Sequence, residues 1–284
     1  MSIKEIQNIF YSELKVVYSQ SDIRSLMFAV LEKTLGLSKT DVALNRDSPI
    51  DGSKIAKILQ VIKKLKAEMP LEYIFSEAHF YGLKLKVNRE VLIPRPETEE
   101  LVQKIIQEVK KDGCNILDIG TGSGCIAIAL ARNNKCANVY ACDISEKAMK
   151  IASFNAKMNK VGITFFLQDI LKPLQNHALP KFDLIVSNPP YVTKSEKKHL
   201  KANVLMYEPH TSLFVPDKSP LLFYKAIAEF AKIHLTKKGM LFFEINENLA
   251  VKLVKLLHSK GFAAIKVMDD LNGKKRFISC LLPS

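Results

Sequence analysis

Residues 116–124 read Ile116-Leu117-Asp118-Ile119-Gly120-Thr121-Gly122-Ser123-Gly124. This apolar stretch runs into a turn with three glycines, and a second apolar segment, residues 125–132, follows it. The pattern predicts a buried β-strand, a turn and a helix. Glycines in such a turn let the backbone approach a ligand closely and leave the helix N-terminus open toward it, so we expect a ligand here. A purely structural turn is the alternative.

The spacing of these glycines restricts what the ligand can be. In the dinucleotide-binding pattern Gly-x-Gly-x-x-Gly the third glycine would fall at position 125, which is Cys125. The sequence also lacks the Gly-Lys-Ser/Thr of a phosphate-binding loop. We therefore expect a nucleotide-like ligand other than NAD or ATP.

Two carboxylates follow later strands of the same region. Asp143 ends the next predicted strand, where a carboxylate can accept two hydrogen bonds from a ribose diol. Asp169 comes just after a further strand, where it would meet an adenine amino group while Ile170 packs on the ring. The simpler interpretations are an N-cap for the next helix at Asp143 and a loop cap at Asp169.

From residue 115 onward, predicted strands and helices alternate. The strands are residues 115–119, 138–142, 164–168, 182–187, 239–245, 263–267 and 277–282, and the helices are residues 124–132, 146–158, 220–235 and 247–260. This alternation predicts an α/β fold with a doubly wound, mostly parallel sheet. The last two strands have no helix between them, so we expect them to pair antiparallel.

The first 75 residues show helical patterns only. Apolar residues recur at intervals of three and four over residues 3–17, which predicts a first helix. Asp22, Ser38 and Asp51 each precede a further helical pattern and are predicted to be N-caps. This part of the chain is expected to be a small helical bundle without chemistry of its own.

The sequence period changes from helical to alternating after the bundle. Residues 76–93 predict a β-hairpin that turns at residues 88–90 and links two domains. Helical spacing resumes over residues 97–109.

A proline-rich turn follows the apolar stretch at residues 182–187, and it reads Asn188-Pro189-Pro190-Tyr191. Proline has no backbone N–H, so the turn is stiff and leaves carbonyl oxygens able to accept hydrogen bonds. Asn188 adds a side-chain acceptor and Tyr191 a flat aromatic face. Two acceptors and a ring suit a planar NH2 group. An ordinary proline turn is the alternative.

Composition excludes several classes of protein. The 284 residues are 48% hydrophobic and 25% charged, as in ordinary globular proteins, and the longest apolar run, residues 125–131, is far shorter than the ~20 residues of a membrane-spanning helix. The five cysteines form no Cys-x-x-Cys pair, so neither a disulfide framework nor a metal site is expected. The first residues carry mixed charge and no apolar signal segment, which favours the cytoplasm.

The net charge of +13 is unevenly distributed along the chain. Residues 1–75 hold 11 Lys and Arg against 9 Asp and Glu, so a net charge of +11 lies in the remainder. Such an excess is either a solvated surface or an attraction for an acidic partner, and charge alone does not choose between them.

Taken together, the glycine turn, Asp143 and the Asn-Pro-Pro-Tyr turn resemble the class I S-adenosylmethionine-dependent methyltransferases that act on amino nitrogens. More narrowly, the chain is similar to the HemK/PrmC family, which methylates N5 of a glutamine in peptide chain release factors. The further segments that carry this resemblance are Pro70–Ile74, Phe80–Gly82, Val91–Glu99, Tyr207–Pro209 and Asp270–Arg276. The chain departs from the family pattern at Met206, Asn246 and Ile170, where the family usually has arginine, glycine and an aromatic residue.

The resemblance implies how the chain is organised and what it binds. It implies a helical substrate-recognition domain at residues 1–75, a β-hairpin linker at 76–93 and a class I methyltransferase domain with a seven-stranded sheet at 94–284. It also implies S-adenosylmethionine as methyl donor, S-adenosylhomocysteine as product, and release factors as protein substrates, modified at the glutamine of a Gly-Gly-Gln motif. A cytoplasmic monomer is expected, without a metal, a membrane or stably bound nucleic acid.

The resemblance further implies the residues of the site. Those expected to bind the cofactor are Gly120, Thr121, Gly122, Ser123, Gly124, Asp143, Asp169, Ile170 and Asn188. Those expected to bind the substrate are Asn188, Pro189, Pro190 and Tyr191, and of these Asn188, Pro189 and Tyr191 are expected to be catalytic. In this mechanism the Asn188 side-chain oxygen and the Pro189 carbonyl accept the two N–H bonds of the glutamine amide.

Two other functions remain open from the sequence. An adenine-N6 methyltransferase would use the same Asn-Pro-Pro-Tyr turn on a flipped base, and the basic surface favours it, although no nucleic-acid-binding module is recognisable. A module that binds S-adenosylmethionine without catalysis is the other, and the intact Asn188 argues against it.

Overall fold

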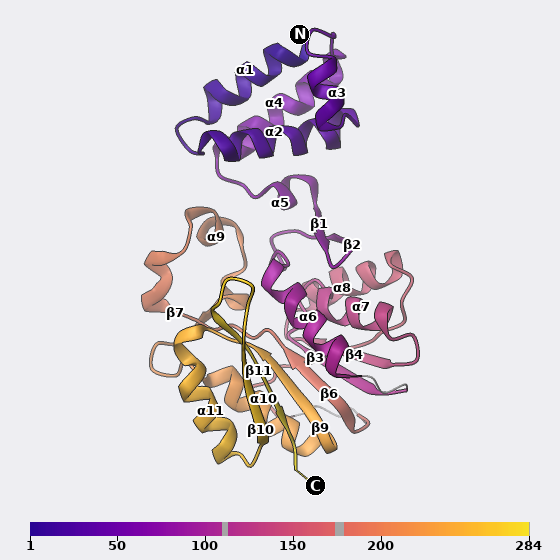
Figure 1. Ribbon diagram of the computed structural model, residues 1–284, viewed down its shortest axis with the longest axis vertical. Helices are drawn as coiled ribbons and strands as arrows, with labels where there is room; N and C mark the ends of the chain where they lie inside the picture. The colour runs from indigo at the N-terminus through magenta and orange to yellow at the C-terminus, as the bar shows by residue number, and fades with distance from the viewer. Residues whose placement is uncertain (110–112, 174–178, 284) are drawn as a thin grey trace. The chain divides into compact units, whose positions relative to one another are not determined.

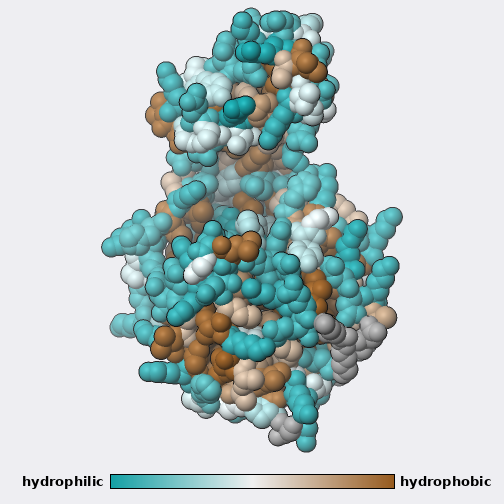
Figure 2. All heavy atoms as spheres, in the orientation of Figure 1, coloured by the Kyte–Doolittle hydropathy of each residue, from teal (hydrophilic) through white to brown (hydrophobic). Residues whose placement is uncertain are grey.

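The computed structural model describes residues 1–109, 113–173 and 179–283, and the chain divides into two compact units, Met1–Phe75 and Ser76–Ser284 (Figure 1). Each unit has a hydrophobic core of its own. The face of the molecule seen in Figure 2 is mostly hydrophilic, in keeping with 42 Lys and Arg and 29 Asp and Glu. Within the described ranges, no helix is both long enough and apolar enough to cross a membrane.

The first unit is a bundle of helices. They are α1 (Ile3–Leu14), α2 (Gln20–Leu35), α3 (Lys39–Leu44), α4 (Gly52–Lys66) and α5 (Leu71–Phe75). The predicted caps at Ser38 and Asp51 are confirmed, because both side chains accept hydrogen bonds from backbone N–H groups of the first turn. The prediction of Asp22 as the cap of α2 is wrong. That helix begins earlier, because the hydroxyl of Ser19 accepts from the backbone N–H of Asp22.

Strands β1 (Glu77–Phe80) and β2 (Leu83–Lys86) form an antiparallel hairpin at the start of the second unit. The chain turns at Tyr81 and Gly82, with φ of 48° and 71°, and not at the predicted residues 88–90. Positive φ at both central residues gives the turn whose twist matches a hairpin, and Gly82 adopts it without strain. The buried side of both strands joins the core of the second unit, so the segment expected to be a linker is part of that unit.

A seven-stranded sheet forms the centre of the second unit, in the order β10-β11-β9-β6-β3-β4-β5 (Figure 1). The strands are β3 (Asn115–Ile119), β4 (Asn138–Asp143), β5 (Thr164–Leu167), β6 (Phe182–Ser187), β9 (Leu235–Glu244), β10 (Ala263–Asp269) and β11 (Lys275–Leu281). Neighbouring strands from β9 to β5 pair parallel, whereas β11 pairs antiparallel with β9 and with β10. The predicted doubly wound, mostly parallel sheet and its antiparallel last pair are confirmed.

Helices cover both faces of this sheet. One face packs against α6 (Pro96–Glu108), α7 (Cys125–Asn133) and α8 (Glu146–Met158), and the other against α10 (Leu222–His234) and α11 (Ala250–Ser259). Successive residues of β3 alternate between the two layers, since Ile116 belongs to the first core and Leu117 to the second. The central strands β3 and β6 are buried on both faces and read as mostly apolar runs, which is why the sequence predicted them.

A series of short elements lies between β6 and α10, and the sequence patterns did not predict it. It consists of β7 (Val192–Thr193), η1 (Lys194–His199), α9 (Ala202–Tyr207), η2 (His210–Ser212) and β8 (Phe214–Val215). A further short element, η3 (Glu247–Leu249), precedes α11. None of these elements is long enough to show a hydrophobic period, so periodicity in the sequence does not predict them.

Candidate active site

A pocket of about 380 Å³ is lined by residues that follow the carboxyl ends of β3, β4, β5 and β6. Strands β6 and β4 lie on opposite sides of β3, so the strand order reverses at β3. Ligands of open α/β sheets bind beside the carboxyl ends of the strands where the order reverses. The predicted site residues that line the pocket are Gly120, Thr121, Gly122, Ser123, Asp143, Asp169, Ile170, Asn188, Pro189 and Pro190. Most of the predicted site therefore comes together in one cavity.

Gly124 and Tyr191 are the two predicted site residues outside this lining. Gly124 has φ of 84° and is the N-cap of α7, and a Cβ placed on it would lie 3.1 Å from the Cβ of Ala152 in α8. Glycine at this position therefore lets α7 approach α8 closely, which is a packing role. Tyr191 packs against the second core of the unit, and its hydroxyl donates to Oε1 of Glu244 at 3.3 Å.

The glycine turn is held by hydrogen bonds at the ends of two neighbouring strands. The backbone N–H groups of Gly120 and Thr121 both donate to the carbonyl of Cys142, at 2.9 and 3.0 Å. The hydroxyl of Thr121 donates to Oδ2 of Asp118 at 2.7 Å. Asp118 is fully buried, and this burial raises the pKa of its carboxyl to about 7. No role was predicted for Asp118, because it lies within an apolar run.

Asp143 joins the glycine turn to the turn that precedes α8. Its Oδ2 accepts from the backbone N–H of Gly122 and its Oδ1 from that of Ser145, each at 2.9 Å. Burial raises the pKa of this carboxyl, while the N–H donors act in the opposite direction. The N-cap of α8 is Ser145, whose hydroxyl accepts from Ala148, so the capping alternative for Asp143 is wrong. A carboxylate that accepts two N–H groups retains lone pairs for further donors.

Asp169 lies on the same pocket but is held differently. Its Oδ1 accepts from the backbone N–H of Leu171 at 3.0 Å, and its Oδ2 lies 3.6 Å from the ammonium of Lys172. The loop-capping interpretation therefore holds for Asp169, and its position beside Ile170 on the pocket wall leaves the ligand role open as well.

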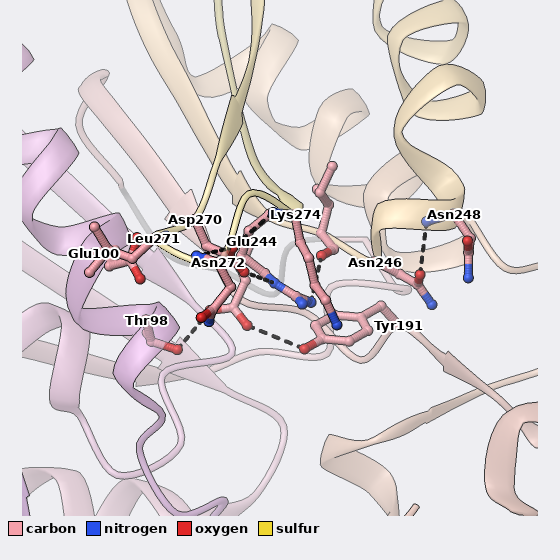
Figure 3. A network of polar contacts seen from close by, with 12 residues as sticks. Thr98, Glu100, Tyr191, Glu244, Asn246, Asn248, Asp270, Leu271, Asn272 and Lys274 are labelled. Atoms are coloured by element: carbon pink, nitrogen blue, oxygen red, sulfur yellow. Dashed lines mark hydrogen bonds and ion pairs between the residues drawn. The ribbon is translucent and has the colours of Figure 1, made fainter. Parts of the chain in front are cut away.

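A chain of polar contacts runs from the Asn-Pro-Pro-Tyr turn into the interior. The side-chain NH2 of Asn188 donates to Oγ1 of Thr98 at 3.2 Å, and the Thr98 hydroxyl donates to Oε2 of Glu244 at 2.7 Å. Figure 3 shows Thr98 and Tyr191 on the two sides of the Glu244 carboxylate. Glu244 is 2% exposed, and burial raises its pKa, while Thr98, Tyr191 and the nearby Arg276 act in the opposite direction.

The start of α6 is what brings Thr98 to this position. Pro96 occupies the first turn of α6, where its missing N–H and fixed φ suit a helix N-terminus, and Thr98 follows within the same turn. Thr98 is 3% exposed, yet it also contributes to the lining of the pocket. It lies in the segment Val91–Glu99 that carried the family resemblance, although no role was predicted for it.

The unpredicted segment after β6 is fixed to the same region by one buried carboxylate. Glu208 is 5% exposed, and its Oε1 accepts from the guanidinium of Arg95. Its Oε2 accepts from the backbone N–H of Ile93 at 3.4 Å. Three and four residues beyond it, Thr211 and Ser212 line the pocket, so this ion pair helps to place one wall of the cavity.

This site defines a class I methyltransferase. The features that define it are the sheet order, the glycine turn after β3, the Asp143 carboxylate at the end of β4 and Asn-Pro-Pro-Tyr after β6. Family models agree: the "Methyltransferase small domain" matches residues 97–213 and the "PrmC N-terminal domain" matches residues 7–75. The chain is 43% identical to a release factor glutamine methyltransferase of Flavobacterium psychrophilum, over 98% of both chains. It is 38% identical to one of Bacteroides thetaiotaomicron, over 94% of this chain and 95% of that one. The chain belongs to the release factor glutamine methyltransferase family, as the resemblance predicted.

Solved structures support the fold independently. A methyltransferase from Pyrococcus furiosus matches with a TM-score of 0.53 at 17% identity, over 82% of this chain and 100% of that one. A 16S rRNA methyltransferase of Thermus thermophilus, in complex with AdoMet and guanosine, also has a TM-score of 0.53 at 18% identity, over 72% of this chain and 49% of that one. At these identities the likeness concerns the fold alone.

Proposed function

We propose that this protein transfers a methyl group from S-adenosylmethionine to N5 of a glutamine in peptide chain release factors, at a Gly-Gly-Gln motif. The observation that carries the proposal is the Asn188 amide at the edge of the pocket, held through its NH2 group and followed by two prolines. This arrangement supports recognition of a planar NH2 group by acceptors alone. Membership of the family supports the choice of a glutamine in a release factor.

The pocket residues fit S-adenosylmethionine chemically. The carboxylate of Asp143 suits the ribose diol, the carboxylate of Asp169 suits the adenine amino group, and the Ile170 side chain suits the face of the ring. The backbone of the turn from Gly120 to Ser123 lines the same cavity, next to the N-terminus of α7. When bound there, S-adenosylmethionine supplies a methyl group activated by its positively charged sulfur.

The chain's own contribution to the reaction is orientation of a poor nucleophile. The lone pair of an amide nitrogen is delocalised into its carbonyl group. The side-chain oxygen of Asn188 and the backbone carbonyl of Pro189 would accept the two N–H bonds of the substrate amide and direct its lone pair toward the pocket. Orientation of this kind contributes on the order of several kcal/mol to lowering a barrier. The N-methylated amide is positively charged and strongly acidic, and it then loses its proton to water.

The substrate suggests where the reaction takes place and with which partner. Release factors act in translation, so we propose a cytoplasmic enzyme whose partner is a protein. The basic surface of residues 76–284 would speed its encounter with an acidic partner. A monomer without stably bound nucleic acid remains our prediction, and light scattering of the purified protein tests it.

One experiment tests the proposal against its alternatives. The protein is incubated with S-adenosylmethionine labelled in the methyl group and with release factor, with release factor whose target glutamine is replaced by alanine, or with DNA. We expect label on unaltered release factor only. Label on DNA would favour the adenine-N6 alternative, and binding of S-adenosylmethionine without any transfer would favour the non-catalytic module.

A further inference from the structure

The direction in which the Asn188 amide faces matters for the proposed chemistry. The oxygen and the NH2 group of an asparagine amide have almost the same shape, so a rotation of 180° exchanges an acceptor for a donor. The glutamine amide nitrogen of the substrate presents N–H donors. Only the oxygen of Asn188 can accept from it, and an NH2 group in the same place would oppose donor to donor.

Thr98 determines which of the two groups of Asn188 faces the substrate side. A hydroxyl group has one hydrogen to donate, and that of Thr98 is directed at Oε2 of Glu244, 2.7 Å away. Oγ1 of Thr98 is therefore left as an acceptor, and it accepts from the NH2 group of Asn188 at 3.2 Å. If the Thr98 hydroxyl pointed the other way, it would hold the Asn188 oxygen instead.

Glu244 determines the direction of the Thr98 hydroxyl in turn. An ionised carboxylate only accepts hydrogen bonds, and its Oε1 already accepts from the hydroxyl of Tyr191 at 3.3 Å. Glu244 is nearly inaccessible to water and lies at the end of β9. The hydroxyl of Tyr224 donates to the backbone carbonyl of Glu244 at 3.1 Å. The hydroxyls of Thr98 and Tyr191 thus both point toward the Glu244 carboxylate, as Figure 3 shows.

We propose that Thr98 and Glu244 are positioning residues, which keep the Asn188 NH2 group facing the interior and its oxygen facing the substrate amide. This inference rests on the proposed function, since it concerns the orientation that glutamine methylation requires. Thr98 is buried at the wall of the pocket and joins Asn188 to Glu244, which is not among the residues that line the pocket.

The test compares three variants of the full-length chain. Thr98→Val keeps the shape but removes the acceptor, and Thr98→Ser keeps the hydroxyl. In the control, which lies in the same unit but outside the pocket lining, Ser259→Ala removes a hydroxyl that donates to the carbonyl of Leu256 in α11. We expect Thr98→Val to lower kcat for release factor on the order of tenfold, the effect of one lost hydrogen bond, with KM and the S-adenosylmethionine affinity nearly unchanged. Thr98→Ser is expected to restore most of kcat, and the control to retain it.

A double-mutant cycle separates positioning from general damage. If Thr98 acts through Asn188, then Thr98→Val causes no further loss of kcat in a chain that already carries Asn188→Ala. An equal loss in both backgrounds, or an unchanged kcat in the single variant, would contradict the inference. Should Thr98→Val fail to fold, Thr98→Cys replaces it, because a thiol of similar size is only a weak acceptor. Wild-type protein that leaves release factor unmodified would contradict the proposed function instead.

Discussion

Asn188 is the residue at which the proposed chemistry is tested most directly. Replacement by alanine removes one acceptor of the substrate amide without changing the glycine turn or Asp143. We therefore expect Asn188→Ala to lower kcat by roughly 10²-fold while calorimetry finds nearly unchanged binding of S-adenosylmethionine. Unchanged turnover of release factor would assign the role of Asn188 to another residue.

Asp118 gives the protein a dependence of stability on pH. Its pKa is about 7 in the folded chain and 3.8 as its ordinary value, so between these values the folded form holds a proton that the unfolded form has lost. The free energy of unfolding therefore falls as pH rises from about 4 to 7, by at most ~1.4 kcal/mol per pH unit for this group, and becomes level above that range.

The Asp118→Asn variant isolates this effect. Burial also raises the pKa values of Asp143 and Glu244. Both residues are present in the wild type and in the variant, so their contributions to the pH dependence of stability cancel in the comparison. We expect the free energy of unfolding of the variant, measured with urea, to gain about 4 kcal/mol relative to the wild type between pH 4 and pH 7. A difference that stays constant over this range would show that Asp118 is ionised in the folded chain.

At this scale, the sequence predicted residues whose chemistry is local and missed those that act across the chain. Gly122, Asp143 and Asn188 each lie at the end of a recognisable strand, so their side of the sheet follows from the pattern. Thr98 contacts Glu244, which is 146 residues away, and neither residue stands out from its neighbours in sequence. This contact forms only when α6 packs beside the end of β9 in the folded chain, so no local sequence pattern predicts it.

The close approach of α7 and α8 depends on Gly124. An alanine there would have a strained positive φ, and its Cβ would lie 3.1 Å from side-chain atoms of Ala152 and Ile128. We expect Gly124→Ala to lower the free energy of unfolding in urea by about 2–4 kcal/mol. At Gly122, with φ of 55°, an added Cβ meets no atom within 4 Å, so Gly122→Ala should cost only about 1–2 kcal/mol. Equal losses would contradict the packing explanation.

Among the elements, long helices and central strands followed from the sequence, whereas short elements did not. Helix α8 was predicted with its observed bounds, because it shows more than three turns of one hydrophobic period. The hairpin turn was misplaced because Tyr81 adopts positive φ, which a bulky residue seldom does. The segment from β7 to β8 is held in part by the contact of Glu208 with Arg95, which lies 113 residues away, so no local pattern predicts it.

At the scale of the whole molecule, the two units allow their roles to be separated. Each has its own hydrophobic core, and the pocket is lined by residues of the second unit only. We expect a chain that begins at Ser76 to bind S-adenosylmethionine but to methylate intact release factor far more slowly than the full-length chain. Contacts must extend beyond a single side-chain pocket, since specific protein complexes bury at least about 1,200 Å² in total.

A short glutamine peptide provides the control for this truncation. We expect it to be a poor substrate for both forms and to lose much less activity than intact release factor when the first unit is removed. A truncated chain that folds, shown by its circular dichroism, and modifies whole release factor at the full-length rate would mean that residues 1–75 have no part in recognition.

The place of β11 in the sheet also sets the order in which the chain can fold during synthesis. Although β11 follows all the other strands in the chain, it lies between β9 and β10, so both of its ladders must wait until residue 281 has been made. The helical unit is complete at Phe75 and relies on contacts that are close in sequence, which form fast. Until β11 arrives, one edge of β9, with the apolar residues Leu241, Phe242 and Phe243, has no partner. Unpaired strand edges invite aggregation, so we expect the nascent chain to be most prone to aggregate during this interval.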